Sequence, residues 1–119
     1  MNNKHCLFVY GTLKKDKENS FLLESEKFIG YASTLEKYPM LKKKDIYYPF
    51  LLNKPTEGNI ISGELYLVSN KTLFELDMFE GPQYYRDEIE VICVGNVMKV
   101  HVYFSKLRNY NENELISDF

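Results

Sequence analysis

The sequence predicts an α+β domain, in which a small, mixed, barrel-like β-sheet of about six strands packs with one main helix. Three observations support this fold class. Apolar runs typical of buried strands occupy 7–9 and 60–68. Two further strand-like runs, 86–94 and 97–104, flank a short turn, and a segment with helical spacing of apolar residues covers 71–80. A curled sheet or small barrel is the simplest way to bury this many strands with a single helix.

Length and composition favour one domain and exclude several classes of protein. A chain of 119 residues can bury one core but not two, so we expect a single domain over 1–119, with its core at about 5–105. The net charge of −2, with both signs interspersed, argues against general nucleic-acid binding. No apolar run approaches the roughly 20 residues that span a bilayer, and 1–5 lacks the features of a signal peptide. We therefore expect a cytoplasmic protein that binds neither nucleic acid nor membranes.

Cysteine and histidine are too scarce to suggest a metal site or a thiol nucleophile. The chain has two cysteines, Cys6 and Cys93, and two histidines, His5 and His101. Neighbouring residues of a strand point to opposite faces, so His5 is badly placed to activate Cys6. We expect two buried free thiols and no bound metal.

The stretch 7–13 predicts a buried strand that ends in a glycine turn. Its apolar residues show no polar alternation, which is typical of a central strand covered on both faces. Gly11 allows unusual backbone conformations and lets a ligand approach the main chain. The N–H groups of Gly11, Thr12 and Leu13 could then bind a carboxylate or an oxyanion. On these residues alone, an ordinary strand followed by a glycine turn is the favoured interpretation.

The middle of the chain predicts shorter elements. We expect a polar loop at 15–20, a helical turn or short connection at 21–23, and a strand at 27–35. A short edge strand is predicted at 46–52, because Pro49 cannot donate to a sheet. The two Tyr-Pro pairs, at 38–39 and 48–49, favour extended or turn geometry and occasionally a cis bond. A clear loop follows at 54–59. The basic run at 42–44 suits a solvated loop, with contact to an acidic partner as the alternative.

The helix carries the residue best suited to chemistry. Ser69-Asn70 is predicted to cap it, and Gly81 followed by Pro82 to end it. On a helical wheel Glu80 lies on an apolar arc formed by Leu73, Leu76 and Phe79. A buried carboxylate has a raised pKa, which suits a general acid or base. The alternative is a glutamate at the helix end bonded to Arg86. A second apolar arc, Phe74 and Met78, leaves the core face of the helix ambiguous.

Other polar residues near the helix end receive weaker assignments. Asp77 is expected to play a structural role rather than to form an acid/base pair with Glu80. Tyr84 and Tyr85 follow the helix and could line a pocket at its end, while Tyr103 lies on a strand face that meets either solvent or a pocket.

The last third of the chain predicts a hairpin and a loose tail. The two strands are expected to turn across Gly95-Asn96, a dipeptide that suits a primed two-residue turn. The polar tail from 106 onward is expected to be loose, with a closing helical turn at 113–116.

Three sequence blocks together resemble the γ-glutamylcyclotransferase-like superfamily, which also includes the plant avirulence-induced proteins. They are Val9-Tyr10-Gly11-Thr12-Leu13, then Gly63-Glu64-Leu65-Tyr66-Leu67-Val68, then Leu76-Asp77-Met78-Phe79-Glu80-Gly81 with Tyr85-Arg86 following. The likeness covers most of the chain, from Phe8 to about Phe104. Tyr38-Pro39-Met40, Pro49-Phe50-Leu51-Leu52 and Phe79-Glu80-Gly81-Pro82 are most similar to the γ-glutamylamine cyclotransferase branch.

This resemblance implies a barrel-like α+β fold with a pocket at its mouth, and a reaction that needs neither metal nor cofactor. It implies that Glu80 is the catalytic acid/base and that Tyr10, Gly11, Thr12 and Leu13 form the turn that binds the glutamyl group. Tyr85 and Tyr103 are further candidates for substrate binding.

The expected reaction is cyclisation of a small γ-glutamyl amine or a related γ-glutamyl compound to 5-oxoproline, with release of a free amine. No obligate protein partner is evident. Two alternatives stay open: a non-catalytic binding module on the same fold, and release of a γ-glutamyl group from a larger biosynthetic carrier.

Overall fold

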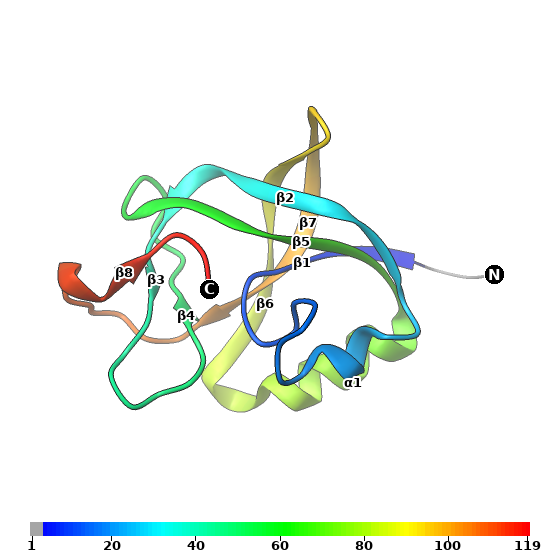
Figure 1. Cartoon of the computed structure of the whole chain (residues 1–119), viewed down its shortest axis with the longest axis horizontal. Coiled ribbons are helices and arrows are strands. Elements are labelled where there is room, and N and C mark those ends of the chain that lie inside the picture. The colour runs from blue at the N-terminus through cyan, green and yellow to red at the C-terminus, as the bar shows by residue number, and fades with distance from the viewer. Residues whose placement is uncertain (1–3) are drawn as a thin grey trace.

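A computed structural model describes residues 4–119 and confirms the predicted α+β, barrel-like fold (Figure 1). Within these residues five strands close into a barrel in the order β1-β5-β2-β6-β7, and a small sheet has the order β4-β3-β8. The strands are β1 Lys4–Val9, β2 Lys27–Tyr38, β3 Met40–Leu41, β4 Phe50–Leu51, β5 Asn59–Ser69, β6 Tyr84–Cys93, β7 Asn96–Ser105 and β8 Leu115–Ile116. The main helix is α1 Asn70–Glu80, and short 3-10 helices cover η1 Ser20–Leu23, η2 Gly81–Gln83 and η3 Glu112–Glu114. Met1–Asn3, part of the segment inspected for a signal peptide, lie outside the described residues.

Strand β1 lies at the centre of the molecule, as its sequence predicts. It pairs antiparallel with β5 along its whole length and parallel with β7 at Leu7 and His101. Phe8 points into the barrel core, whereas Leu7 and Val9 point the other way, into a second core shared with α1. All three side chains are at most 3% exposed. Both faces of the strand are therefore covered, which explains its lack of polar alternation.

Helix α1 packs on the barrel through one face only. Leu73 and Leu76 are buried in the second core, while Phe74 and Met78 are 66% and 71% exposed, so the ambiguity of the two apolar arcs is resolved. Phe79 was predicted on the core arc, but it lies in the last turn of the helix, outside the second core, and is 47% exposed. The predicted caps are present: the Ser69 hydroxyl accepts from Thr72 N at 3.2 Å, and Gly81 ends the helix with a φ of 73°.

The predicted position of the hairpin turn and the predicted bounds of the strand at 46–52 are wrong. The hairpin turns at Val94-Gly95, one residue earlier than expected, with Cys93 paired to Asn96. Both turn residues have positive φ, 49° and 77°, which a type I′ turn requires. The predicted strand at 46–52 shortens to Phe50–Leu51. The peptide bonds in the described part of the chain include no cis bond.

The C-terminal tail is not loose as predicted, although the predicted closing helical turn at 113–116 is present in part, as η3 at Glu112–Glu114. Strand β8 pairs with β3, and beyond it Ser62 N donates to Ser117 O at 2.9 Å. Lys14 Nζ forms an ion pair with Asp118 at 3.0 Å, so the chain end folds back toward the barrel (Figure 1). Ile116 packs against the barrel core. Strand pairing, polar bonds and apolar packing together attach the tail to the barrel.

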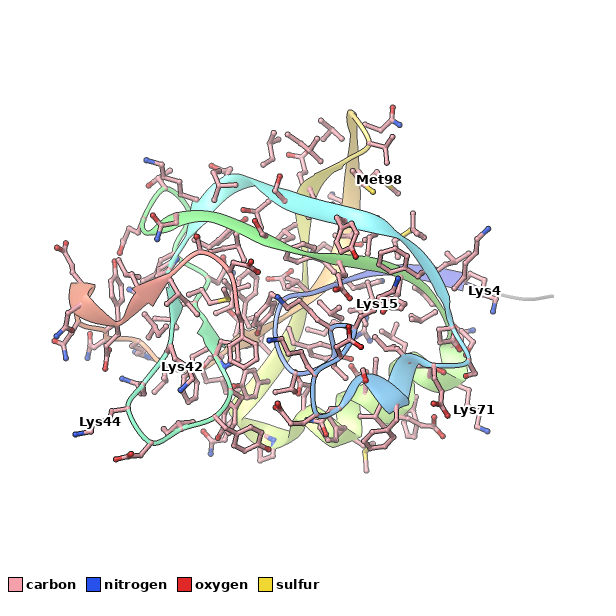
Figure 2. All side chains as sticks on the ribbon, viewed as in Figure 1. Lys4, Lys15, Lys42, Lys44, Lys71 and Met98 are labelled. Atoms are coloured by element: carbon pink, nitrogen blue, oxygen red, sulfur yellow. The ribbon has the colours of Figure 1, made fainter. Side chains whose placement is uncertain are left out.

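Surface lysines mostly project outward (Figure 2). The basic run at 42–44 is different, because two of its members bond within the molecule. Lys42 Nζ donates to the carbonyls of Lys43 and Ile46, and Lys43 pairs with Glu114 at 3.1 Å. Only Lys44 of this run is exposed, as Figure 2 shows.

Both cysteines are free thiols, although only Cys93 is fully buried and Cys6 is partly exposed. Within residues 4–119, no group of three His, Cys, Asp or Glu side chains lies close enough to hold a metal ion. No helix in this part of the chain has the length and apolar character to cross a membrane.

Candidate active site

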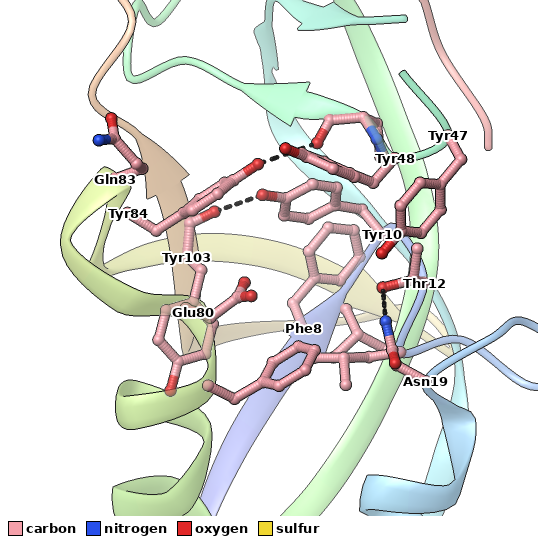
Figure 3. Close-up of a pocket in the computed structure, with 15 residues that line it drawn as sticks. Phe8, Tyr10, Thr12, Asn19, Tyr47, Tyr48, Glu80, Gln83, Tyr84 and Tyr103 are labelled. Atoms are coloured by element: carbon pink, nitrogen blue, oxygen red, sulfur yellow. Dashed lines mark hydrogen bonds between the residues drawn. The ribbon is translucent and has the colours of Figure 1, made fainter. Parts of the chain in front are cut away.

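A cavity of about 340 Å³ lies where the turn after β1 meets the end of α1 (Figure 3). A third wall comes from the segment that precedes β4. Of the residues that line the cavity, only Glu80 carries a charged side chain, and aromatic rings form much of the remaining surface. The lining residues are Phe8, Val9, Tyr10, Gly11, Thr12, Leu13, Asn19, Tyr47, Tyr48, Pro49, Phe79, Glu80, Gln83, Tyr84 and Tyr103.

Glu80 occupies the last turn of α1, and its carboxylate points into the cavity (Figure 3). Burial raises the pKa of Glu80 to about 7, and no other group contributes appreciably. The alternative of a bond to Arg86 is wrong, because the guanidinium of Arg86 binds Asp77 instead. A carboxyl group with this pKa can both accept and donate a proton near neutral pH.

Asp77 lies one helical turn before Glu80 and is fully bonded. It accepts from Arg86 Nε at 2.9 Å and Nη2 at 3.1 Å, and from the Tyr103 hydroxyl at 2.6 Å. Partial burial raises the pKa of Asp77, but the hydrogen bonds from Arg86 and Tyr103 outweigh it and lower the pKa below the ordinary value. Asp77 therefore stays ionised and fixes the helix to the barrel, which is the structural role expected for it.

The structure brings all four residues of the predicted turn to the cavity wall. The Tyr10 hydroxyl donates to Tyr103 O at 2.6 Å, and the Thr12 hydroxyl accepts from Asn19 Nδ2 at 2.9 Å (Figure 3). Because the Thr12 oxygen is the acceptor, its own proton is free to bond a ligand. Leu13 contributes to the cavity wall and to the core beneath α1.

Gly11 is favoured by close packing and not by the unusual backbone conformation that was predicted. Its φ is not positive, so the turn needs no unusual backbone conformation there. A Cβ at this position would lie 3.0 and 3.1 Å from Cγ and Cδ of Pro49. Gly11 thus permits the turn to pack tightly against the segment that precedes β4.

Bonds outside the cavity hold the turn in place. Lys14 N donates to Gly11 O at 3.1 Å, and Asn19 N donates to Thr12 O at 2.9 Å. Lys15 N donates to the buried carboxylate of Glu64 at 2.8 Å. Among the described residues we find no acceptor for the N–H groups of 11–13. These donors are available for a ligand.

Of the two other residues predicted to bind substrate, Tyr85 and Tyr103, only Tyr103 lies at the cavity. Tyr85 does not line the cavity: its ring packs near Phe104, with centroids 5.9 Å apart. Its neighbour Tyr84 lines the cavity instead and donates to Pro49 O at 3.4 Å. Tyr103 reaches the cavity with its main chain, while its ring turns beneath α1 toward Asp77.

Four further residues that line the cavity were not predicted, namely Asn19, Tyr47, Tyr48 and Gln83. Tyr47 and Tyr48 precede Pro49 in a loop far from Glu80 along the chain. The Tyr-Pro pair was the available signal, but it indicates backbone geometry and not spatial neighbours.

Comparison with known sequences identifies the family of the chain. The sequence profile of the family described as "Gamma-glutamyl cyclotransferase, AIG2-like" matches residues 7–118. This chain belongs to that family. The chain is similar to Gamma-glutamylaminecyclotransferase C of Danio rerio, with 44% identity over 77% of this chain and 66% of that protein's length. Gamma-glutamylaminecyclotransferase B of the same fish is 44% identical over 67% of this chain but only 45% of its own length.

Solved structures show the same fold. The crystal structure of an AIG2-like protein from Mus musculus has a TM-score of 0.84 and 28% sequence identity, covering 97% of this chain and 86% of that one. The names of the family and of these relatives indicate γ-glutamylcyclotransferase enzymes.

Proposed function

We propose that this protein is a γ-glutamylamine cyclotransferase, with Glu80 as its general acid/base. The observation that carries the proposal is the position of Glu80: an unpaired carboxylate in the cavity, with a pKa of about 7. Family membership supports the reaction class. The bound ligand would be a small γ-glutamyl compound.

The reaction needs little beyond a correctly folded substrate and one proton carrier. The α-amino nitrogen of the substrate attacks its own γ-carbonyl carbon, forming the lactam C–N bond of 5-oxoproline as the bond to the leaving nitrogen breaks. Such intramolecular attack has a high effective molarity once the chain is held folded. Glu80 takes a proton from the α-ammonium group, which makes that nitrogen nucleophilic, and delivers it to the departing amine.

The turn 10–13 would bind an anionic oxygen of the substrate. Its N–H groups and the Thr12 hydroxyl are donors without a described acceptor on the protein. Preorganised donors of this kind stabilise a carboxylate or the oxyanion that develops during attack. The reacting amino group would then lie against the opposite wall, next to Glu80.

The cavity favours a neutral or cationic leaving amine. Tyrosine rings at 47, 48 and 84 line it, and no cationic side chain does so. Aromatic faces tolerate an ammonium group, whereas a leaving group with carboxylates would be buried near Glu80 without a counter-charge. We therefore expect γ-glutamyl amines to be better substrates than glutathione.

The two other functions find less support. A module that only binds small anions gains nothing from an unpaired carboxylate in its cavity. Release from an acidic carrier protein would use the lysine loop, but Lys42 and Lys43 bond within the molecule.

The test is release of 5-oxoproline from γ-glutamyl-lysine, γ-glutamyl dipeptides, simple γ-glutamyl amides and glutathione. Wild type should turn over at least one γ-glutamyl amine, and Glu80→Gln should not. Glu75→Gln is the matched control, because it makes the same change at an exposed site on the same helix. Activity of Glu80→Gln near the wild-type level would refute the mechanism, and no activity of wild type on the whole panel would refute the assignment.

A further inference from the structure

Tyr103 connects the two walls of the cavity. Its main-chain oxygen accepts from the Tyr10 hydroxyl at 2.6 Å, on the turn side. Its own hydroxyl donates to Asp77 Oδ1 at 2.6 Å, on the helix side. The residue is only 3% exposed, so these bonds lie largely out of water. Through its hydroxyl and its main-chain oxygen, Tyr103 therefore links the helix that carries Glu80 to the turn that carries Tyr10.

Arg86 completes the attachment on the helix side. Its guanidinium holds both oxygens of Asp77, a two-point contact that a lysine cannot reproduce. A further nitrogen of the same group lies 3.2 Å from His101 Nδ1, which fixes the guanidinium on β7 as well. Asp77 is thus held by two neighbouring strands, three residues before Glu80.

We propose that Tyr103, Asp77 and Arg86 are positioning residues that set where the Glu80 carboxylate lies relative to the turn 10–13. The inference rests on the proposed function, because it assigns these residues to the alignment of its acid/base. None of the three side chains is needed to touch the substrate. The cluster holds the last turns of α1 against β6 and β7.

The groups facing Glu80 make its protonation a sensitive reporter of this geometry. They are the phenol groups that interact electrostatically with Glu80: Tyr10 in the turn after β1, Tyr84 on β6, and Tyr103 on β7, whose ring lies beneath α1. Burial keeps all three uncharged by raising their pKa values. No charged side chain of the cavity wall balances Glu80. If the end of α1 loosens, water reaches the carboxylate and its pKa falls toward that of an ordinary glutamate.

The experiment compares wild type with Tyr103→Phe, Asp77→Asn and Arg86→Lys. The pKa of Glu80 is followed by carboxyl NMR titration, together with kcat and KM on the best γ-glutamyl amine. We expect each variant to lower the pKa of Glu80 and to reduce kcat about 10- to 100-fold, because small misplacements of a catalytic group are costly. KM should change by less than about twofold, since substrate contacts are retained.

The control for simple loss of stability is Thr34→Val. The buried Thr34 hydroxyl bonds Glu36 O and Ile61 N within the barrel and away from the cavity. This variant should lower the melting temperature without moving the pKa of Glu80 or kcat. An unchanged Glu80 pKa and kcat in both Tyr103→Phe and Arg86→Lys would overturn the positioning role. The NMR titration tests the positioning role even if wild type has no cyclotransferase activity. Failure of the positioning role can therefore be distinguished from failure of the proposed function.

Discussion

Two carboxylates in the last turns of α1 lie three residues apart and have opposite properties. Asp77 accepts three hydrogen bonds, and its pKa lies below the ordinary value. Glu80 has no described partner, and burial raises its pKa to about 7. The same helix thus holds one group that is ionised at neutral pH and one whose pKa lies near neutral pH. The difference comes from what each side of the helix faces and not from the residue type.

The barrel explains why the two sides differ. Asp77 faces β6 and β7, where it binds the side chains of Arg86 on β6 and Tyr103 on β7. Glu80 lies just beyond this supported region and faces the space between the helix end and the turn after β1. The wall opposite supplies backbone donors, but none that is within bonding distance of Glu80. The fold therefore raises the pKa of Glu80 by burying its carboxylate without a hydrogen-bond partner among the described residues.

The largest expected effect comes from exchanging each carboxylate for its amide. Glu80→Gln removes the proton carrier and should lower turnover by about 10²- to 10⁴-fold. Asp77→Asn should cost only about 10-fold, because it disturbs position and not chemistry. Both are measured by 5-oxoproline release, with Glu75→Gln expected to match wild type. Equal losses in Glu80→Gln and Asp77→Asn would mean that the two carboxylates act as one unit.

The second prediction concerns the dependence of the rate on pH. Glu80 must be deprotonated to accept a proton from the α-ammonium group, so kcat/KM should rise with pH and level off above about 7. At pH 5 the rate should be roughly 100-fold below the plateau, since the ionised fraction falls tenfold per pH unit. An acidic limb with its midpoint near 4.5 would show that Glu80 is solvated in the working enzyme.

Sequence patterns predicted the parts of this site that depend on local chemistry. Ser69 and Gly81 define the helix because capping and termination act over a few residues. Glu80 stood out because a carboxylate on an apolar arc conflicts with the helical pattern. The buried strand at 7–9 was equally clear from its composition.

The wrong or missing predictions concern strand register and contacts between residues far apart in the sequence. Tyr84 and not Tyr85 lines the cavity, because alternation along β6 sends neighbours to opposite faces and sequence does not say which one faces in. The Arg86–Asp77 pair and the tail strand β8 arise from segments that meet only in the folded barrel. The need for glycine at position 11 comes from Pro49, almost forty residues away. Such contacts leave no local pattern.

The third prediction concerns stability, where the two carboxylates should act in opposite directions. The pKa of Glu80 is higher in the folded chain than in the unfolded chain, where it is near 4.5. The folded state therefore holds more protons between these values, and stability falls as pH rises from 4.5 to 7. Glu80→Gln removes this penalty and should raise the free energy of unfolding at pH 8 by on the order of 1–3 kcal/mol.

Asp77→Asn should instead lower the free energy of unfolding. A lowered pKa stabilises the fold above the ordinary value of 3.8, and this contribution is lost as pH falls through the folded pKa. Because Asp77 is partly exposed, the loss at pH 7 should be only about 1 kcal/mol. Urea denaturation of both variants at pH 5 and pH 8 tests the contrast. A destabilised Glu80→Gln at pH 8 would show that the Glu80 carboxylate has a stabilising partner in solution.

The smallest expected effect lies on the wall opposite the helix, at Gly11. Alanine there suffers no backbone strain, because φ is not positive, but its Cβ would crowd Pro49 at 3.0 Å. Pro49 must shift by a few tenths of an ångström, which should cost about 0.5–1 kcal/mol of stability and raise KM two- to fivefold, by rough estimate. The shift would also admit some water to the cavity, so the pKa of Glu80 should fall slightly while that of Asp77 stays unchanged. Turnover as low as that of Glu80→Gln would instead mean that a ligand passes so close to the main chain at Gly11 that a methyl group blocks it.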